Sequence, residues 1–247
     1  MIKFNSITKR RVLSLKKFLF ERKLRREILK NCVRLIYLDH GWSAKEITTF
    51  PLESFFETPL QTTVIPNTYK DGNTSPLELL ILSSFVVLKK PKTLLEIGTF
   101  NGLTTLHLAL NSPPSSVVHT LDLPLLYPTK KSCFDQEDLK FIESKERENV
   151  LFKKFSIDNI QMHYGNSLEF DFLRFGQLDF AFIDGGHSYE IVKNDSEKTL
   201  KNLSHGGTIL WHDYEPNTPG VFSYLNELSK THALKHIEGT SLVIFSR

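Results

Sequence analysis

A short glycine turn between two apolar segments constrains the fold more than any other stretch of the chain. It lies within residues 93–111, TLLEIGTFNGLTTLHLALN. Leu94, Leu95 and Ile97 form a short apolar run typical of a strand, and the leucines of residues 103–110 suit a helix better than a strand. Gly98 and Gly102 between them allow close backbone approaches that a Cβ would prevent. The stretch therefore predicts a strand, a tight turn and a helix whose N-terminus can hold a small polar ligand.

The residues of this turn disfavour a dinucleotide as that ligand. A dinucleotide-binding turn has the pattern G-x-G-x-x-G, whereas here Glu96 precedes Gly98 and Gly102, and position 100 is Phe. A carboxylate at Glu96 would repel a pyrophosphate but would suit a cation, such as S-adenosylmethionine with its ammonium and sulfonium. Further along, Asp122 ends a second predicted strand, where an acid bonds two ribose hydroxyls in nucleotide-binding folds. The alternative is that Asp122 only caps a loop.

Two later strands also end in residues that can carry chemistry. Residues 178–183, LDFAFI, predict a buried strand that ends in Asp184, with His187 shortly after it. Residues 208–211 predict the next strand. Ligands of doubly wound sheets bind at the carboxyl ends of the strands. One edge of the sheet is therefore expected to gather Glu96, Asp122, Asp184, His187, His212 and Asp213.

Asp184, His212 and Asp213 form a candidate site for a divalent metal ion. Carboxylate oxygens with one imidazole suit Mg²⁺, Mn²⁺ or Fe²⁺. The alternative is structural: His212 is then a buried, hydrogen-bonded residue at a strand end, and His187 caps the helix predicted over about residues 189–203.

Together these motifs resemble the class I S-adenosylmethionine-dependent methyltransferases. The resemblance is closest to a bacterial branch of small-molecule and sugar O-methyltransferases, and it rests on the first motif, on DGGHSYE at residues 184–190 and on WHDY at residues 211–214. It covers residues 69–247. It implies a doubly wound, seven-stranded, Rossmann-like α/β sheet with an antiparallel C-terminal strand, and methyl transfer from S-adenosylmethionine to a hydroxyl of a small molecule or sugar.

The resemblance also implies roles for individual residues. His187 would be the base, with Asp184 as its catalytic neighbour, and the metal ligands would be Asp184, His212 and Asp213. The cofactor would be held by Glu96, Gly98, Thr99, Gly102, Asp122, Asn166, Ser167 and Asp184. The chain departs from the family at His212, where relatives usually have an acid, and at Asn166, where many have Asp. Two other function classes stay open: a dinucleotide-dependent oxidoreductase, and a non-catalytic cofactor-binding or membrane-associated scaffold.

The N-terminal part of the chain is strongly basic. Residues 1–40 hold twelve Lys and Arg against three acids, a net charge of +9, whereas the whole chain carries +3 and the remainder therefore −6. The spacing of its apolar residues predicts a basic helical extension and linker over residues 1–66, ahead of a methyltransferase domain over residues 67–247. The extension is expected to pack on the domain or on a second copy of the chain. Contact with an anionic membrane surface is the alternative, and nucleic acid is the least favoured partner.

Several smaller features complete the sequence-based description. Ser75, Pro76 and Glu78 predict a capped helix from Pro76 to about residue 88. The charged run of residues 135–147 predicts a mostly exposed helix that borders the substrate pocket. Only two cysteines are present, Cys32 and Cys133, which is too few for a disulfide framework and predicts a cytoplasmic setting.

Overall fold

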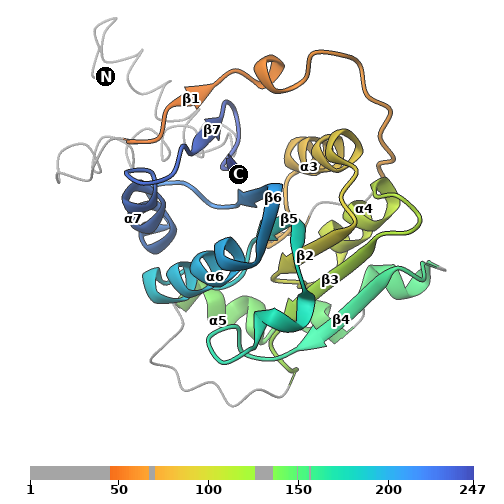
Figure 1. The fold of residues 1–247 in the computed structure, drawn as a ribbon. Helices are drawn as coiled ribbons and strands as arrows, with labels where there is room; N and C mark the ends of the chain where they lie inside the picture. Colours follow the sequence, from red (N-terminus) through yellow and green to blue (C-terminus); the bar gives the residue numbers. More distant parts are fainter. Residues whose placement is uncertain (1–44, 67–69, 126–135, 149, 156) are drawn as a thin grey trace, which may run out of the picture. The chain divides into compact units, whose positions relative to one another are not determined.

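The computed structural model describes residues 45–66, 70–125, 136–148, 150–155 and 157–247 of the chain. Residues 47–247 are built on an eight-stranded sheet with the order β1-β7-β8-β6-β5-β2-β3-β4 (Figure 1). The strands are β1 (Thr49–Phe50), β2 (Thr93–Ile97), β3 (Val117–Asp122), β4 (Ile160–Tyr164), β5 (Leu178–Ile183), β6 (Leu203–Trp211), β7 (Lys235–Ile237) and β8 (Val243–Ser246).

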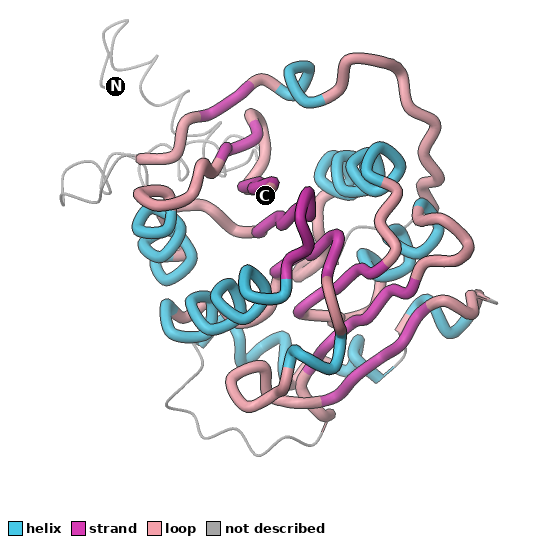
Figure 2. The backbone as a smooth tube through the Cα atoms, viewed as in Figure 1, coloured by secondary structure: helices cyan, strands magenta, loops and turns pink. Residues whose placement is uncertain are grey.

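The strand directions confirm the predicted doubly wound methyltransferase sheet. Strands β6, β5, β2, β3 and β4 run parallel, and β8 lies antiparallel between β6 and β7. Figure 2 shows the strands in magenta and the helices around them in cyan. The sheet also contains β1, which pairs in parallel with β7 and raises the number of strands from the predicted seven to eight. A strand of two residues, Thr49 and Phe50, has no periodicity from which it could be predicted.

Helices cover both faces of the sheet because its central strands alternate apolar side chains between two cores. Leu94 packs with α3 (Pro76–Lys89) and α4 (Leu103–Asn111), whereas its neighbour Leu95 packs with α6 (Tyr189–Asn202) and α7 (Pro219–Leu228). This arrangement buries β2 on both faces and leaves only the ends of the parallel strands open for a ligand.

The remaining helices are short. They are η1 (Leu52–Phe55), α5 (Gln136–Ile142), η2 (Lys145–Glu148), η3 (Leu151–Lys154) and η4 (Phe172–Phe175). The expectation of a mostly exposed charged run is wrong at two positions: Asp138 on α5 and Arg147 on η2 are each only 4% exposed. Both charges are buried because each has an opposite charge or a histidine beside it.

The capping box predicted for α3 is present. The Ser75 hydroxyl accepts a hydrogen bond from the Glu78 N–H, and the Glu78 carboxylate accepts one from the Ser75 N–H. Other predictions lie outside the described residues, namely the basic helices of residues 1–40 and both cysteines. Within the part of the chain that the structure describes, no helix is long and apolar enough to cross a membrane.

Candidate active site

The register of the central strands brings the predicted polar residues to one edge of the sheet. Ile97 on β2 pairs with Leu121 on β3 and with Ile183 on β5, and Ile183 pairs with Trp211 on β6. The residues that follow these four paired positions therefore lie side by side at the carboxyl edge: Gly98, Asp122, Asp184 and His212.

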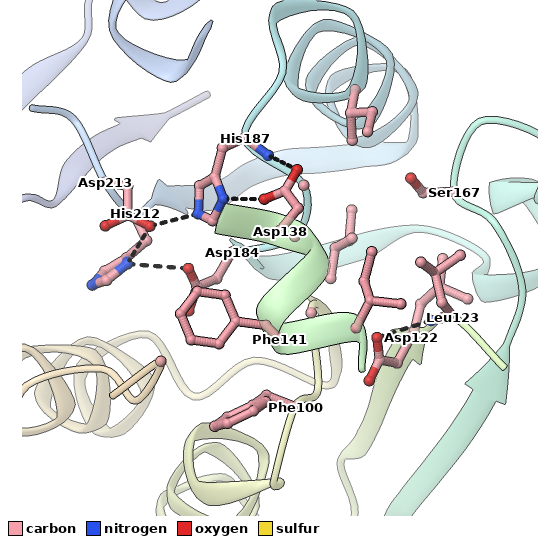
Figure 3. A pocket seen from close by; sticks show the side chains of 18 of the residues that line it. Phe100, Asp122, Leu123, Asp138, Phe141, Ser167, Asp184, His187, His212 and Asp213 are labelled. Atoms are coloured by element: carbon pink, nitrogen blue, oxygen red, sulfur yellow. Dashed lines mark hydrogen bonds and ion pairs between the residues drawn. The ribbon is translucent and has the colours of Figure 1, made fainter. Parts of the chain in front are cut away.

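A cavity of about 450 Å³ opens at this edge (Figure 3). Its size falls within the range of small-molecule sites. Eight of the predicted site residues line it: Gly98, Asp122, Asn166, Ser167, Asp184, His187, His212 and Asp213. Three others do not line it, namely Glu96, Thr99 and Gly102, so a direct contact of these three with the cofactor stays a prediction.

Glu96 lies fully buried beneath the turn instead of facing the cavity. Its Oε2 accepts hydrogen bonds from the hydroxyls of Thr105 and Thr120, the latter at 2.6 Å, and Thr120 is bonded in turn to Thr99 at 2.6 Å. Burial raises the pKa of Glu96 to about 8, although the two hydroxyl bonds act against the shift. Glu96 is therefore mostly neutral at pH 7, and the attraction for a cation expected of its carboxylate does not operate there.

The buried Glu96 predicts a pH-dependent stability. Its folded pKa lies above its unfolded value of 4.5, so its contribution is fully present below pH 4.5 and is lost as the pH rises through about 8. Glu96→Gln cannot ionise. We expect the unfolding free energy of the wild type to fall, relative to that of Glu96→Gln, by a few kcal/mol across this window, at about 1.4 kcal/mol per pKa unit. Urea unfolding at several pH values from 4.5 to 8 measures both free energies. A difference between wild type and Glu96→Gln that stays constant with pH would contradict a neutral Glu96.

Asp122 is paired with an arginine that the sequence did not single out. Its carboxylate accepts hydrogen bonds from the Leu123 N–H at 2.8 Å and from the Nε of Arg147 at 3.2 Å. Arg147 also donates to the carbonyl oxygens of Leu123 and Ile142. Burial raises the pKa of Asp122, and the Arg147 charge opposes the shift. This ion pair holds η2 beside the cavity wall.

His187 lies between two carboxylates, as Figure 3 shows. Its Nδ1 contacts Asp138 Oδ1 on α5, and its Nε2 lies 2.9 Å from Asp213 Oδ2. Burial lowers the pKa of His187, but the bonds and charges of Asp138 and Asp213 outweigh burial and raise it to about 10. The cap of α6 is Ser188, whose side chain accepts from the Ile191 N–H, so the alternative that His187 caps this helix is wrong.

His212 lies at the end of β6 among three acids. Its Nε2 is 3.2 Å from Glu78 Oε2 on α3, and its Nδ1 is 3.1 Å from both Asp184 Oδ1 and Asp213 Oδ2. Burial lowers the pKa of His212, but the charges of Asp184 and Asp213 raise it well above its usual value. A positive charge at Nδ1 is therefore favourable, and either a proton or a metal ion can supply it.

The backbone at Asp213 is held in an unusual conformation. Its φ of 59° lies in the left-handed region, which costs a non-glycine residue free energy. The Asp213 N–H donates to the Ser241 hydroxyl at 3.2 Å, and the turn directs the carboxylate back toward His187 and His212. Backbone strain of this kind clusters at functional sites.

Sequence patterns missed three residues that complete the site. Glu78 was recognised only as a helix cap, and Asp138 and Arg147 lay within a charged run. The structure joins each of them to a predicted site residue: Glu78 to His212, Asp138 to His187 and Arg147 to Asp122. No local spacing signals these pairs, because each links separate elements of the chain.

Comparison with known proteins agrees with the fold. Residues 95–214 match a family model described as a methyltransferase domain. Among curated proteins, the chain is 27% identical over 143 residues to an uncharacterized protein of Acanthamoeba polyphaga mimivirus. That match covers 57% of the chain and 60% of the viral protein, so the chain spans only part of its relative's length.

Solved structures share the fold at low sequence identity. The O-methyltransferase TomG of Streptomyces achromogenes, solved with S-adenosylmethionine, is 16% identical with a TM-score of 0.52, over 79% of this chain and 85% of TomG. An O-methyltransferase, described as putative, from Klebsiella pneumoniae is 18% identical with a TM-score of 0.52, over 72% and 82% of the two chains. The methyltransferase PaMTH1 of Podospora anserina, solved with S-adenosylhomocysteine, is 18% identical with a TM-score of 0.51, over 72% and 80%.

The matched domain begins on β2 and ends just beyond Asp213, so it includes the ends of all five strands that border the cavity, β2, β3, β4, β5 and β6. The sheet order, the glycine turn after β2 and the acid at the end of β3 agree with it. Residues 95–214, just under half of the chain, therefore match a methyltransferase domain, and residues 47–247 have the fold of the class I S-adenosylmethionine-dependent methyltransferases.

Proposed function

We propose that this methyltransferase transfers the methyl group to a hydroxyl of a small molecule or sugar with the help of a divalent metal ion. The observation that carries the proposal is the cluster of Asp184, His212 and Asp213 on the cavity wall, whose candidate ligand atoms all lie within 4.8 Å of one another. The proposal is also supported by TomG and the Klebsiella protein, which share the fold and are described as O-methyltransferases.

The two ends of the cavity differ in their side chains, so each end is suited to a different part of the reaction. Asp122 and Ser167 lie at one end, and His187, His212 and Asp213 lie at the other, as Figure 3 shows. Asn166, the neighbour of Ser167 in the chain, also lines the cavity. Gly98 lies at the wall between β2 and β5. In our proposal the nucleoside part of S-adenosylmethionine binds near Asp122, and the acceptor hydroxyl binds beside His187 and Asp184.

The cluster fits a metal ion in its donor set. The Nδ1 of His212 is buried and faces two carboxylates at 3.1 Å, so one nitrogen and two oxygen donors converge on one point. When bound, a divalent ion would lower the pKa of an acceptor hydroxyl, and S-adenosylmethionine would supply a methyl group on a sulfonium. Asp184, His212 and Asp213 would hold the ion.

His187 is the group placed to exchange a proton with the acceptor. Asp138 engages Nδ1, which directs Nε2 toward Asp213 and the cavity. Methyl transfer forms an oxygen–carbon bond, breaks a sulfur–carbon bond and releases the hydroxyl proton. Because Asp138 and Asp213 raise the pKa of His187, the imidazole accepts that proton only where another cation compensates their charges.

Methyl transfer to oxygen can be tested directly. The full chain would be incubated with methyl-labelled S-adenosylmethionine and acceptors with two neighbouring hydroxyls, catechols and sugars, with Mn²⁺ or Mg²⁺ or with EDTA. We expect label on a hydroxyl oxygen, lost with EDTA. Label only on nitrogen or carbon acceptors would contradict the proposed acceptor class, and transfer unchanged by EDTA would contradict the metal.

Replacing Asp122 with Asn is expected to weaken cofactor binding. The variant keeps the size of the side chain but loses a charged acceptor, and hydrogen bonds to charged groups contribute about 1.5–3 kcal/mol. We therefore expect a roughly 10- to 100-fold higher Kd for S-adenosylhomocysteine, measured by calorimetry. Asp171→Asn, at an exposed turn outside the cavity lining, is the matched control. Equal affinity of the Asp122 variant and the wild type would refute a ribose contact.

A further inference from the structure

We propose that Glu78 fixes His212 as a nitrogen ligand, so that the site selects a transition-metal ion such as Mn²⁺, Fe²⁺ or Zn²⁺ over Mg²⁺. The inference rests on the metal-assisted function proposed above. Its starting point is that Glu78 belongs to no methyltransferase motif of the sequence, yet lies 3.2 Å from the imidazole at the end of β6.

Glu78 is surrounded by hydrogen-bond donors. The N–H and hydroxyl of Ser75 donate to its Oε2, and the N–H and hydroxyl of Ser241 donate to its Oε1, at 2.7–3.2 Å. The side chain is buried, so these bonds hold it in one position. A carboxylate with this set of partners acts as an acceptor only. The Nε2 of His212 therefore carries the hydrogen and donates to Glu78.

This assignment leaves the Nδ1 of His212 to face Asp184 and Asp213. Nδ1 is buried and lies 3.1 Å from one oxygen of each carboxylate. Neighbouring ligands of an octahedral ion with bonds of about 2.1 Å lie about 3 Å apart. A histidine that binds a metal through one ring nitrogen and donates the other N–H to a carboxylate is the common arrangement in metalloproteins. Glu78 occupies the position of that second carboxylate.

The nitrogen ligand determines the kind of ion. Mg²⁺ favours oxygen ligands and gains little from imidazole, whereas Mn²⁺, Fe²⁺ and Zn²⁺ accept imidazole together with carboxylates. With an acid at position 212 the site would present oxygen atoms only. His212 therefore converts an oxygen site into a mixed nitrogen and oxygen site, and Glu78 holds the ring in the required orientation.

Metal affinity of the full chain tests the proposal without any activity measurement. Mn²⁺ binding would be followed by loss of the free Mn²⁺ signal in electron paramagnetic resonance, with Mg²⁺ as competitor. We expect Mn²⁺ to bind about tenfold or more tightly than Mg²⁺. Glu78→Gln should weaken Mn²⁺ binding about 10- to 100-fold. Ser75→Ala removes the helix cap and one hydrogen bond to Glu78 but keeps the Glu78 carboxylate with its bonds to Ser241 and His212, so it should change Mn²⁺ affinity far less.

A second variant keeps the proposal testable if Glu78→Gln does not fold. His212→Asp should reduce the preference for Mn²⁺ over Mg²⁺. Equal or tighter Mg²⁺ binding by the wild type, unchanged Mn²⁺ affinity in Glu78→Gln, or equal losses in Glu78→Gln and Ser75→Ala would overturn this inference and leave metal-assisted transfer standing. If the wild type binds S-adenosylhomocysteine but neither ion, the metal part of the proposed function fails together with it.

Discussion

Asp184→Asn is expected to lower kcat/KM for methyl transfer on the order of 100-fold or more while the protein stays folded. Asp184 lines the cavity, and its Oδ1 lies 3.1 Å from the Nδ1 of His212. Asn keeps the shape of the side chain and the backbone hydrogen bond from the Asp184 N–H to Ile97 at 2.9 Å. The variant therefore removes the negative charge at the proposed metal and acceptor end with little change in the sheet.

Asp179→Asn is the matched control for this prediction. Asp179 lies near the start of the same strand, and its carboxylate accepts hydrogen bonds from the N–H groups of Lys92 and Thr93 and from the Ser204 hydroxyl. The substitution removes the same charge from the opposite edge of the sheet, so kcat/KM should stay close to the wild-type value. Steady-state kinetics with labelled S-adenosylmethionine measures both variants. Similar losses in the two variants would show that Asp184 acts through the fold alone.

Gly98→Ala is expected to cost several kcal/mol of unfolding free energy, enough to threaten folding. Gly98 has a φ of +97°, a conformation that side chains rarely adopt. A Cβ at this position would lie 1.9 Å from the carbonyl oxygen of Asp184, which belongs to the backbone and cannot rotate away. The turn after β2 and the end of β5 would have to separate, and the cavity edge would change with them.

Gly239→Ala separates the effect of backbone conformation from the effect of contact. Gly239 has a similar φ of +76°, but a Cβ there would meet nothing within 4 Å. We expect Gly239→Ala to lower the unfolding free energy by about 1–2 kcal/mol because of the left-handed conformation alone. Urea unfolding of both variants measures the two losses of unfolding free energy. A loss in Gly98→Ala no larger than that in Gly239→Ala would contradict the close approach of β2 and β5.

The positions of the strand ends could be predicted from the sequence because they depend on local patterns. Apolar runs ending in Asp122, Asp184 and His212 imply parallel strands whose ends meet at one edge, and the observed register agrees. The antiparallel pair of β7 and β8 is joined by a turn at Gly239, a residue typical of such turns. These features follow from periodicity and turn residues, which are properties of short stretches.

The partners of these residues could not be predicted, because each pair is distant in sequence. Glu78 and His212 are 134 positions apart, and Asp138 and His187 are 49 apart. Side chains at such separations meet only after the sheet and its helices have packed. The same reason explains Glu96: its place in the turn motif suggested an exposed carboxylate, whereas packing of α4 on β2 buries it beneath Thr105.

The most direct test of the account is a calorimetric titration of the full chain with S-adenosylhomocysteine, in the presence of Mn²⁺ and again with EDTA. The account predicts saturable binding of one molecule per chain in the cavity lined by Gly98, Asp122 and Asp184. No binding heat under either condition, with the protein folded, would contradict the claim that this cavity is a methyltransferase cofactor site.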